Sequence, residues 1–166
     1  TLSIEELSSS LNEEFDNALS GQVETAFSIL QFVFKEYEAG KYTLDEAKKI
    51  SADILRELRY GDDGYFWVMD VTGIDVVDPV EPDQEGRNQM NDTDDTGQKY
   101  VKSLIETAQN NPEGGFTEYT FLHPDTKKEI PKRSFSKLYE PYGWVVGTGN
   151  YVSAVNDFID KSEQDL

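Results

Sequence analysis

Basic side chains are scarce in this chain, and a third of them lie in one short segment. The sequence has 15 Lys and Arg residues against 33 Asp and Glu, and five of the basic residues fall within residues 127–137. Such cations can bind an anion through charge-assisted hydrogen bonds. The segment has the pattern of a strand, in which alternate side chains face opposite ways. One face would carry Lys132, Ser134 and Ser136, and the other Arg133, Phe135 and Lys137. The alternative to an anion pocket is a solvated edge strand, on which Lys discourages aggregation.

No catalytic or metal-binding pattern accompanies this segment. The single histidine, His123, has no Ser, Cys or paired base at a suggestive spacing, and a catalytic histidine needs an orienting partner. Cysteine is absent, which excludes disulfides and thiolate sites. Residues 92–97 resemble the start of a calcium loop, but Ser103 stands where that loop needs a bidentate glutamate. We therefore expect a protein that is not an enzyme and that carries no metal and no cofactor.

Composition limits the partners further. The net charge of −18 and the pI near 4.2 argue against nucleic-acid binding, because no basic stripe exists to neutralise phosphates. At 166 residues, 37% of them hydrophobic, the chain suits one domain with a real core. No apolar run approaches the roughly 20 residues of a membrane span, so the sequence is either a complete soluble protein or a piece of a longer one.

The first 60 residues have a helical pattern. Apolar residues recur every three or four positions from Leu7 to Tyr37, which predicts one long helix ending near Gly40. At about 1.5 Å per residue this helix would be roughly 50 Å long, more than one small domain can cover. The uncovered part would face either a dimer partner or solvent. A capping box at residues 43–46 predicts a second helix over residues 44–58.

The rest of the chain alternates strands with turns. Residues 65–70 and 74–78 flank a Gly turn and predict a hairpin, and the polar segment 80–97 is long enough to be a lid. We expect a helix over 98–110, strands over 115–123, 130–140 and 144–152, and a short final helix. This order indicates an α+β fold with a mostly antiparallel sheet.

From Gly40 to Val152 the chain resembles the single Cache sensor domain of bacterial methyl-accepting chemotaxis proteins and sensor kinases. The resemblance rests on ordered motifs: RYGDDGYFW at residues 59–67, the turn at Gly73, Pro79 with Gly86, Pro131-Lys132, and GWVVGTGNY at residues 143–151. It implies a PAS-like five-stranded antiparallel sheet with a long N-terminal helix (residues 1–40), a ligand-binding domain (41–152) and a C-terminal helix (153–166) leading toward a membrane span. The domain would be the periplasmic part of a membrane-anchored receptor. The partner expected for the uncovered stripe of the N-terminal helix is a second copy of the chain, in a homodimer.

The resemblance also implies a ligand and a site. The ligand would be a small carboxylate, with pyruvate or acetate expected. Lys132 matches the Pro-Lys motif and would pair with the carboxylate, with Arg87 as the second candidate cation. We predict the following further site residues: Tyr65, Trp67, Met90, Tyr119, Phe121 and Ser134. The chain departs from many relatives at Asp78, where they carry His, and at Phe135, where they carry Tyr. The alternatives are the sensor domain of a membrane histidine kinase and a soluble acidic α+β enzyme.

Overall fold

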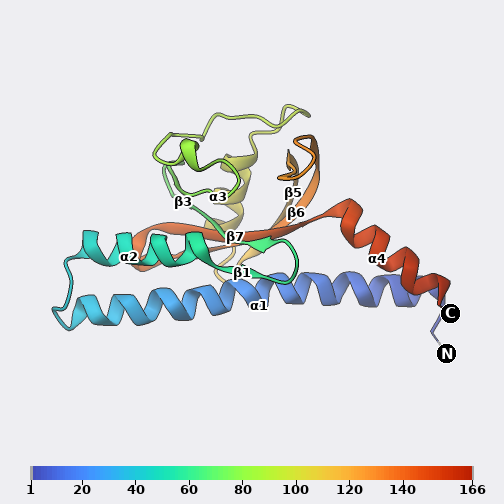
Figure 1. The fold of residues 1–166 in the computed structure, drawn as a ribbon, viewed down its shortest axis with the longest axis horizontal. Helices are drawn as coiled ribbons and strands as arrows, with labels where there is room; N and C mark the ends of the chain where they lie inside the picture. Colours follow the sequence, from blue (N-terminus) through green and yellow to red (C-terminus); the bar gives the residue numbers. More distant parts are fainter. Residues whose placement is uncertain (1, 166) are drawn as a thin grey trace.

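A helix of 35 residues, α1 (Ile4–Glu38), runs along one side of the whole molecule (Figure 1). The computed structural model describes residues 2–165. Ser3 caps the helix, because its hydroxyl accepts from the Glu6 amide while the Glu6 carboxylate accepts from the Ser3 amide. This capping box places the start of the helix ahead of Leu7, the first residue of the predicted helix.

The second helix, α2 (Leu44–Glu57), packs against the C-terminal half of α1. Gly40, with φ of 85°, lets the chain turn back between the two helices. Thr43 and Glu46 form the predicted capping box. Ala47, Ser51 and Leu55 are buried on the inner side of α2. This helix therefore packs against the sheet in addition to packing against α1.

Five strands form the central sheet: β3 (Trp67–Asp70), β4 (Asp75–Val77), β5 (Gly115–Leu122), β6 (Glu129–Tyr139) and β7 (Trp144–Tyr151). Their spatial order is β4-β3-β7-β6-β5, and every neighbouring pair is antiparallel. The predicted α+β fold with a five-stranded antiparallel sheet is therefore confirmed. Two short 3-10 helices, η1 (Pro82–Gln84) and η2 (Glu140–Tyr142), lie in the connections.

The segment before β3 differs from its prediction. Arg59–Tyr60 (β1) and Gly64–Tyr65 (β2) pair as a separate two-stranded ribbon, so the strand predicted over residues 65–70 is interrupted at Phe66. Gly61, with φ of 55°, allows the tight turn between β1 and β2. The ring of Tyr60 lies against the position where Gly64 would carry a Cβ, which only glycine permits.

The sheet separates two layers of packing. On one face, α1 and α2 enclose the larger apolar core with residues such as Leu30, Val68 and Val146. On the other face, α3 (Tyr100–Asn110) packs through Val101, Leu104, Ile105 and Ala108 against a second apolar core. Figure 1 shows α1 below the strands and α3 above them. The second layer is thinner, and long loops complete it.

Strand β6 presents the alternation that the sequence predicts. On the α1 face, Arg133 pairs with Asp16 of α1 at 2.9 Å, and Lys137 pairs with Glu24 of α1. On the α3 face, the Ser136 hydroxyl donates to the Leu104 carbonyl of α3. Lys132 and Ser134 share the Ser136 face by the period of two. Only one of the three basic residues in this strand therefore points toward the second layer.

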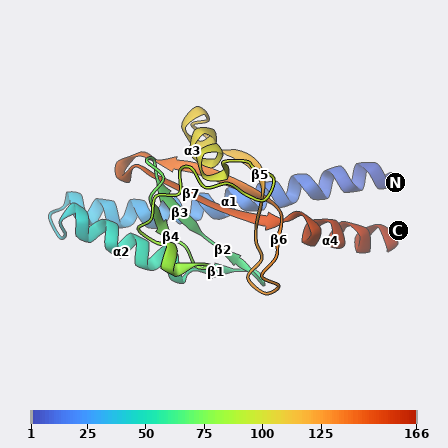
Figure 2. The same ribbon diagram turned by 90° about the horizontal axis from the view of Figure 1, so that it is seen from above.

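The last helix, α4 (Val152–Gln164), returns beside the start of α1. Phe158 contacts Phe15 edge to face, and the Ser8 hydroxyl donates to Glu163. Part of the apolar stripe that was predicted to face a dimer partner or solvent is thus covered by α4 of the same chain. Both ends of the chain lie at one end of the molecule (Figures 1 and 2). Within residues 2–165, no helix is both long and apolar enough to cross a membrane.

Candidate ligand-binding site

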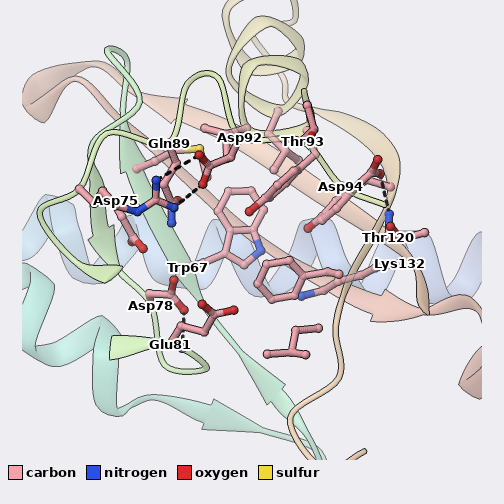
Figure 3. A pocket seen from close by; sticks show the side chains of 18 of the residues that line it. Trp67, Asp75, Asp78, Glu81, Gln89, Asp92, Thr93, Asp94, Thr120 and Lys132 are labelled. Carbon is pink, nitrogen blue, oxygen red and sulfur yellow. Dashed lines mark hydrogen bonds and ion pairs between the residues drawn. The ribbon is translucent and has the colours of Figure 1, made fainter. Parts of the chain in front are cut away.

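A cavity of about 480 Å³ lies between the sheet and the layer formed by α3 and the loops (Figure 3). Strands β3 to β6 supply its floor, α3 supplies one wall, and the connection between β4 and α3 forms the remaining wall. Cavities of this size suit small-molecule ligands. The residues whose side chains matter below are Tyr65, Trp67, Asp75, Asp78, Glu81, Arg87, Asp92, Asp94, Tyr119, Phe121 and Lys132.

Lys132 is the buried cation of this cavity. Only 1% of its surface is exposed, and its Nζ donates to the Tyr65 hydroxyl at 2.8 Å. The rings of Tyr65, Phe121 and Tyr151 surround the Nζ at 4.7 to 5.3 Å from their centroids. Burial lowers the pKa of Lys132 to about 7, although the negative charge of Asp78 opposes the shift. An ammonium has three donors, and the hydrogen bonds among residues 2–165 give this one a single oxygen partner.

Neutral aromatic side chains complete the apolar part of the cavity. Tyr100 of α3 stacks on Tyr119 of β5, with ring centroids 5.4 Å apart. The Tyr119 hydroxyl forms a hydrogen bond of 2.8 Å with Ser134, which is fully buried. Burial raises the pKa of both tyrosines and of Tyr65, so all three stay protonated at neutral pH. This part of the cavity therefore offers hydroxyl donors and apolar surface without negative charge.

The opposite part of the cavity is acidic. Asp75 of β4 is 4% exposed, and Asp78 and Glu81 follow it into the cavity lining. Burial, and then hydrogen bonding with the neighbouring Asp78 carboxylate, raise the pKa of Asp75. Figure 3 shows Trp67 near the middle of the cavity, with Asp75 and Asp78 to one side and Lys132 to the other.

Within residues 2–165, two buried polar atoms of the cavity lining have no hydrogen-bond partner. They are the indole Nε1 of Trp67 and the Oδ2 of Asp75. Buried polar groups are nearly always paired, because an unpaired one forfeits its hydrogen bonds to water. One of these atoms is a donor and the other belongs to a carboxyl group. Both residues line one cavity, where a ligand or an ordered water can complete these hydrogen bonds.

The loop that closes the cavity is fixed by Asp94. Its Oδ1 accepts from the backbone amides of Thr96 and Gln98, and its Oδ2 accepts from the backbone amide of Thr120 on β5. Asp94 is buried although it lies in a loop. Asp94 thus ties the loop to the edge strand of the sheet, and the neighbouring Asp95 accepts from the Thr120 hydroxyl of the same strand. Loss of the Asp94 bonds would loosen the loop.

The structure places the predicted site residues unequally. Six of the eight line the cavity: Tyr65, Trp67, Arg87, Tyr119, Phe121 and Lys132. Met90 and Ser134 are outside its lining: Met90 packs against the second apolar core beside Gly73, and Ser134 lies behind Tyr119. Arg87 forms an ion pair with Asp92, so its charge is already compensated. His123 lies outside the lining, where its Nδ1 accepts from the backbone amides of the following turn.

Sequence reasoning missed the acidic side of the cavity. Asp75 and Val77 are the buried positions of β4, with Val76 less buried between them. An acid at a buried position of a strand is a signal of a functional site, because an unpaired charge is costly there. The sequence marks Asp78 only as a departure from relatives, and neither Asp75 nor Asp78 is among the predicted site residues.

The comparisons with known proteins agree with this arrangement. The model of single Cache domain 2 matches residues 11–165. The chain belongs to this family. It is 39% identical over 111 residues to the sensor histidine kinase MctS of Rhizobium johnstonii, a match covering 67% of this chain and 24% of MctS. It is 26% identical over 133 residues to the methyl-accepting chemotaxis protein McpP of Pseudomonas putida, covering 80% of this chain and 24% of McpP. The chain thus spans about a quarter of each relative.

Solved structures show the same fold. A periplasmic sensor domain of a chemotaxis protein superposes with a TM-score of 0.80 at 31% identity, covering 86% of this chain and 97% of the other. A Cache chemosensory domain described as recognising carboxylic acids superposes with a TM-score of 0.82 at 26% identity, covering 87% and 97%. The predicted resemblance is confirmed, and the chain is a ligand-sensing domain of the Cache type.

Proposed function

We propose that this domain is the extracytoplasmic sensor of a membrane-anchored chemoreceptor and that it binds a small carboxylate in the cavity around Lys132. The observation that carries the proposal is the ammonium of Lys132, which is fully buried, lines the cavity and has one oxygen partner among the described residues. A carboxylate beside this ammonium gains a charge-assisted hydrogen bond in a site shielded from water. Pyruvate and acetate are the first ligands to test.

The neighbours of Lys132 define how the carboxylate is held. Tyr65 fixes the position of the ammonium, and the unpaired Nε1 of Trp67 adds a second donor. Phe121 packs over the ammonium and keeps water away from it. In this arrangement the carboxylate lies between Lys132 and Trp67, and Arg87 has no direct role because it pairs with Asp92. Met90 and Ser134 act only by supporting the lining.

Signal output depends on the rest of the receptor. We propose residues 41–152 as the ligand-binding unit, with residues 1–40 and 153–166 connecting it toward the membrane. Because the matched relatives include a histidine kinase and a chemotaxis protein, the kinase output is the second candidate. In either case the ligand must bind one of two arrangements of the domain more tightly, since equal affinity shifts no equilibrium. We propose that α1 moves between these arrangements.

Titration calorimetry with a panel of ligands tests the proposal directly. The panel contains two- to four-carbon monocarboxylates, amino acids, amines and urea. We expect at least one monocarboxylate to bind, and to raise the melting temperature of the domain with increasing ligand concentration. Binding of amines or urea without binding of any carboxylate would overturn the assignment of the ligand class.

We also propose a homodimer through α1. Phe32 of α1 is 66% exposed and, with Phe27 and Tyr139, borders a surface groove. Sedimentation velocity with and without the bound carboxylate measures the oligomeric state. A monomer under both conditions at high protein concentration would overturn dimerisation of the isolated domain, whereas loss of a dimer in Phe32→Glu would locate the interface.

A further inference from the structure

We propose that the ligand carries a hydrogen-bond donor, a hydroxyl or ammonium group, in addition to its carboxylate, and that Asp75 accepts from this donor. The inference rests on the proposed function and adds a second point of recognition to the same cavity. It assigns Asp75 as a specificity residue that selects among small carboxylates.

Asp75 has an oxygen beside the cavity without a hydrogen-bond partner in the described part of the chain. Asp75 is 96% buried, since 4% of its surface is exposed, and it lines the cavity. Its Oδ2 has no hydrogen-bond partner among residues 2–165. The free energy lost by such a group is regained when a ligand donates to it. A ligand that only fills the space with methyl or methylene groups would leave the oxygen unpaired.

The Asp75 carboxyl group is protonated beside Asp78, and its protonation determines which hydrogen bonds it can make. Two adjacent carboxylates in a buried site do not both ionise, so Asp75 and Asp78 hold one proton between them. The raised pKa of Asp75 indicates that this proton belongs to Asp75. We infer that this proton lies on Oδ1 and is shared with Asp78, which leaves Oδ2 as the oxygen without a hydrogen-bond partner among residues 2–165. Oδ2 is then the carbonyl oxygen of a neutral acid, and it can only accept a hydrogen bond.

Hydrogen-bond donors lie at one side of the cavity and an acceptor lies at the other. Lys132 and the Nε1 of Trp67 are donors that suit a carboxylate, and Asp75 on the other side of Trp67 is an acceptor (Figure 3). A hydroxy acid or an amino acid matches this order, with its carboxylate toward the donors and its hydroxyl or ammonium toward Asp75. A keto group would place its lone pairs against Oδ2, and an alkyl group would make no bond.

The remaining charges of the lining exclude a second carboxylate on the ligand. Asp78 and Glu81 stand beside Asp75, and Glu129 lies at the start of β6. The other cation of the lining, Arg87, is paired with Asp92. Since like charges repel strongly in a site shielded from water, a dicarboxylate such as succinate should bind far more weakly than a monocarboxylate.

A series of three-carbon acids tests the inference. Propionate, pyruvate, lactate and alanine have the same carbon skeleton and differ only at the second carbon; 3-hydroxypropionate and β-alanine move the donor to the third carbon. Calorimetry should give a dissociation constant at least about tenfold lower for one of the donor-bearing acids than for propionate and pyruvate, as expected when a buried acceptor gains its partner. The comparison of lactate with alanine tells hydroxyl from ammonium.

Two substitutions at Asp75 make the test specific. Asp75→Leu removes the acceptor and keeps the branching at Cγ, with a larger side chain, and should reduce the preference for the donor-bearing acid to about twofold or less. Asp75→Asn should keep the preference, because its amide can donate to Asp78 while its oxygen faces the cavity. Asp83→Leu is the matched control, since Asp83 is an exposed acid of η1 outside the cavity lining. Thermal unfolding verifies that each variant is folded.

The outcomes separate the inference from the proposed function. The role of Asp75 is refuted, while carboxylate binding stands, if propionate or pyruvate binds as tightly as every donor-bearing acid. It is also refuted if the preference for the donor-bearing acid persists in Asp75→Leu, or if Asp75→Asn loses this preference as fully as Asp75→Leu does. If no acid of the series binds, and acetate does not bind either, the proposed function fails and the inference fails with it.

Discussion

The affinity of the domain for a carboxylate should fall steeply as the pH rises above 7, because the ligand binds the ammonium form of Lys132. Burial lowers the pKa of Lys132 to about 7 in the empty cavity, against a usual value of 10.5. Roughly nine-tenths of the side chain is then protonated at pH 6, and about 3% at pH 8.5. The apparent affinity should therefore decrease about 30-fold over this range, close to 2 kcal/mol.

Calorimetry between pH 6 and 8.5 measures this decrease directly. Near pH 8 most of the empty domain carries neutral Lys132, so binding must take up close to one proton, and buffers with different ionisation enthalpies report that uptake. Ionisation of Asp75 at the upper end of the range would add negative charge and weaken binding further, which is the same direction.

The variant Lys132→Met separates the two contributions. Loss of the charge-assisted contact should cost about 2 kcal/mol or more, at least about 30-fold in affinity at pH 6, and abolish the proton uptake. Lys137→Met is the matched control, because Lys137 lies on the same strand but pairs with Glu24 on the opposite face. Tight binding that does not change with pH in the wild type, or unchanged affinity in a folded Lys132→Met domain, would refute the assignment of Lys132.

Three further perturbations follow from the same geometry. The pKa of Asp75 is raised on folding, so between about pH 4 and the raised pKa the folded state holds a proton that the unfolded state has lost. The contribution of Asp75 to the stability of the fold therefore declines as the pH rises through this range. The melting temperature of Asp75→Asn, relative to wild type, should accordingly increase with pH in a series of melts; a constant difference would contradict this. Asp94→Ala removes the acceptors of three backbone amides and should lower the free energy of local opening of the loop by about 1–3 kcal/mol. Faster hydrogen exchange in residues 92–98 and faster ligand release would show this effect. Unchanged exchange would mean that Asp94 does not hold the loop in place. Gly147→Ala would place a Cβ against the Trp67 ring and 2.8 Å from the Phe135 carbonyl oxygen. It should lower the free energy of unfolding, measured by urea titration, by about 1–3 kcal/mol, and it should also weaken ligand binding. Full ligand affinity in this variant would show that the position of Trp67 is unimportant for binding.

The elements that rest on local periodicity could be predicted from the sequence. The spacing of apolar residues gave the long first helix, and the Thr43 capping box gave the start of α2. The period of two in β6 separated Lys132 from Arg133, which the structure places on opposite faces. These features are determined by residues close in the chain, so a pattern of neighbours contains the information. The ribbon of β1 and β2 was missed because it depends on one tight turn.

Pairings between distant segments could not be predicted in this way. Arg87 carries the charge that a carboxylate site needs, and only the folded loop shows that Asp92 already pairs with it. Ser134 lies on the same face as Lys132, but Tyr119 of the neighbouring strand covers it. Both residues were chosen for their chemistry, and in both cases the neighbour that determines their role is set by loop conformation or strand register.

The choice of lysine rather than arginine at position 132 follows from the state of the empty cavity. Burial lowers the pKa of Lys132 to about 7 and raises the pKa of Asp75, so near neutral pH about half of the empty domains carry a neutral Lys132 while Asp75 keeps its proton. An arginine would stay charged, because its pKa exceeds 12, and the empty domain would then contain a buried guanidinium without a carboxylate partner. With a pKa near 7, a lysine is instead partly neutral in the empty cavity, and a bound carboxylate favours its ammonium form. Binding near neutral pH therefore increases the positive charge beneath α3.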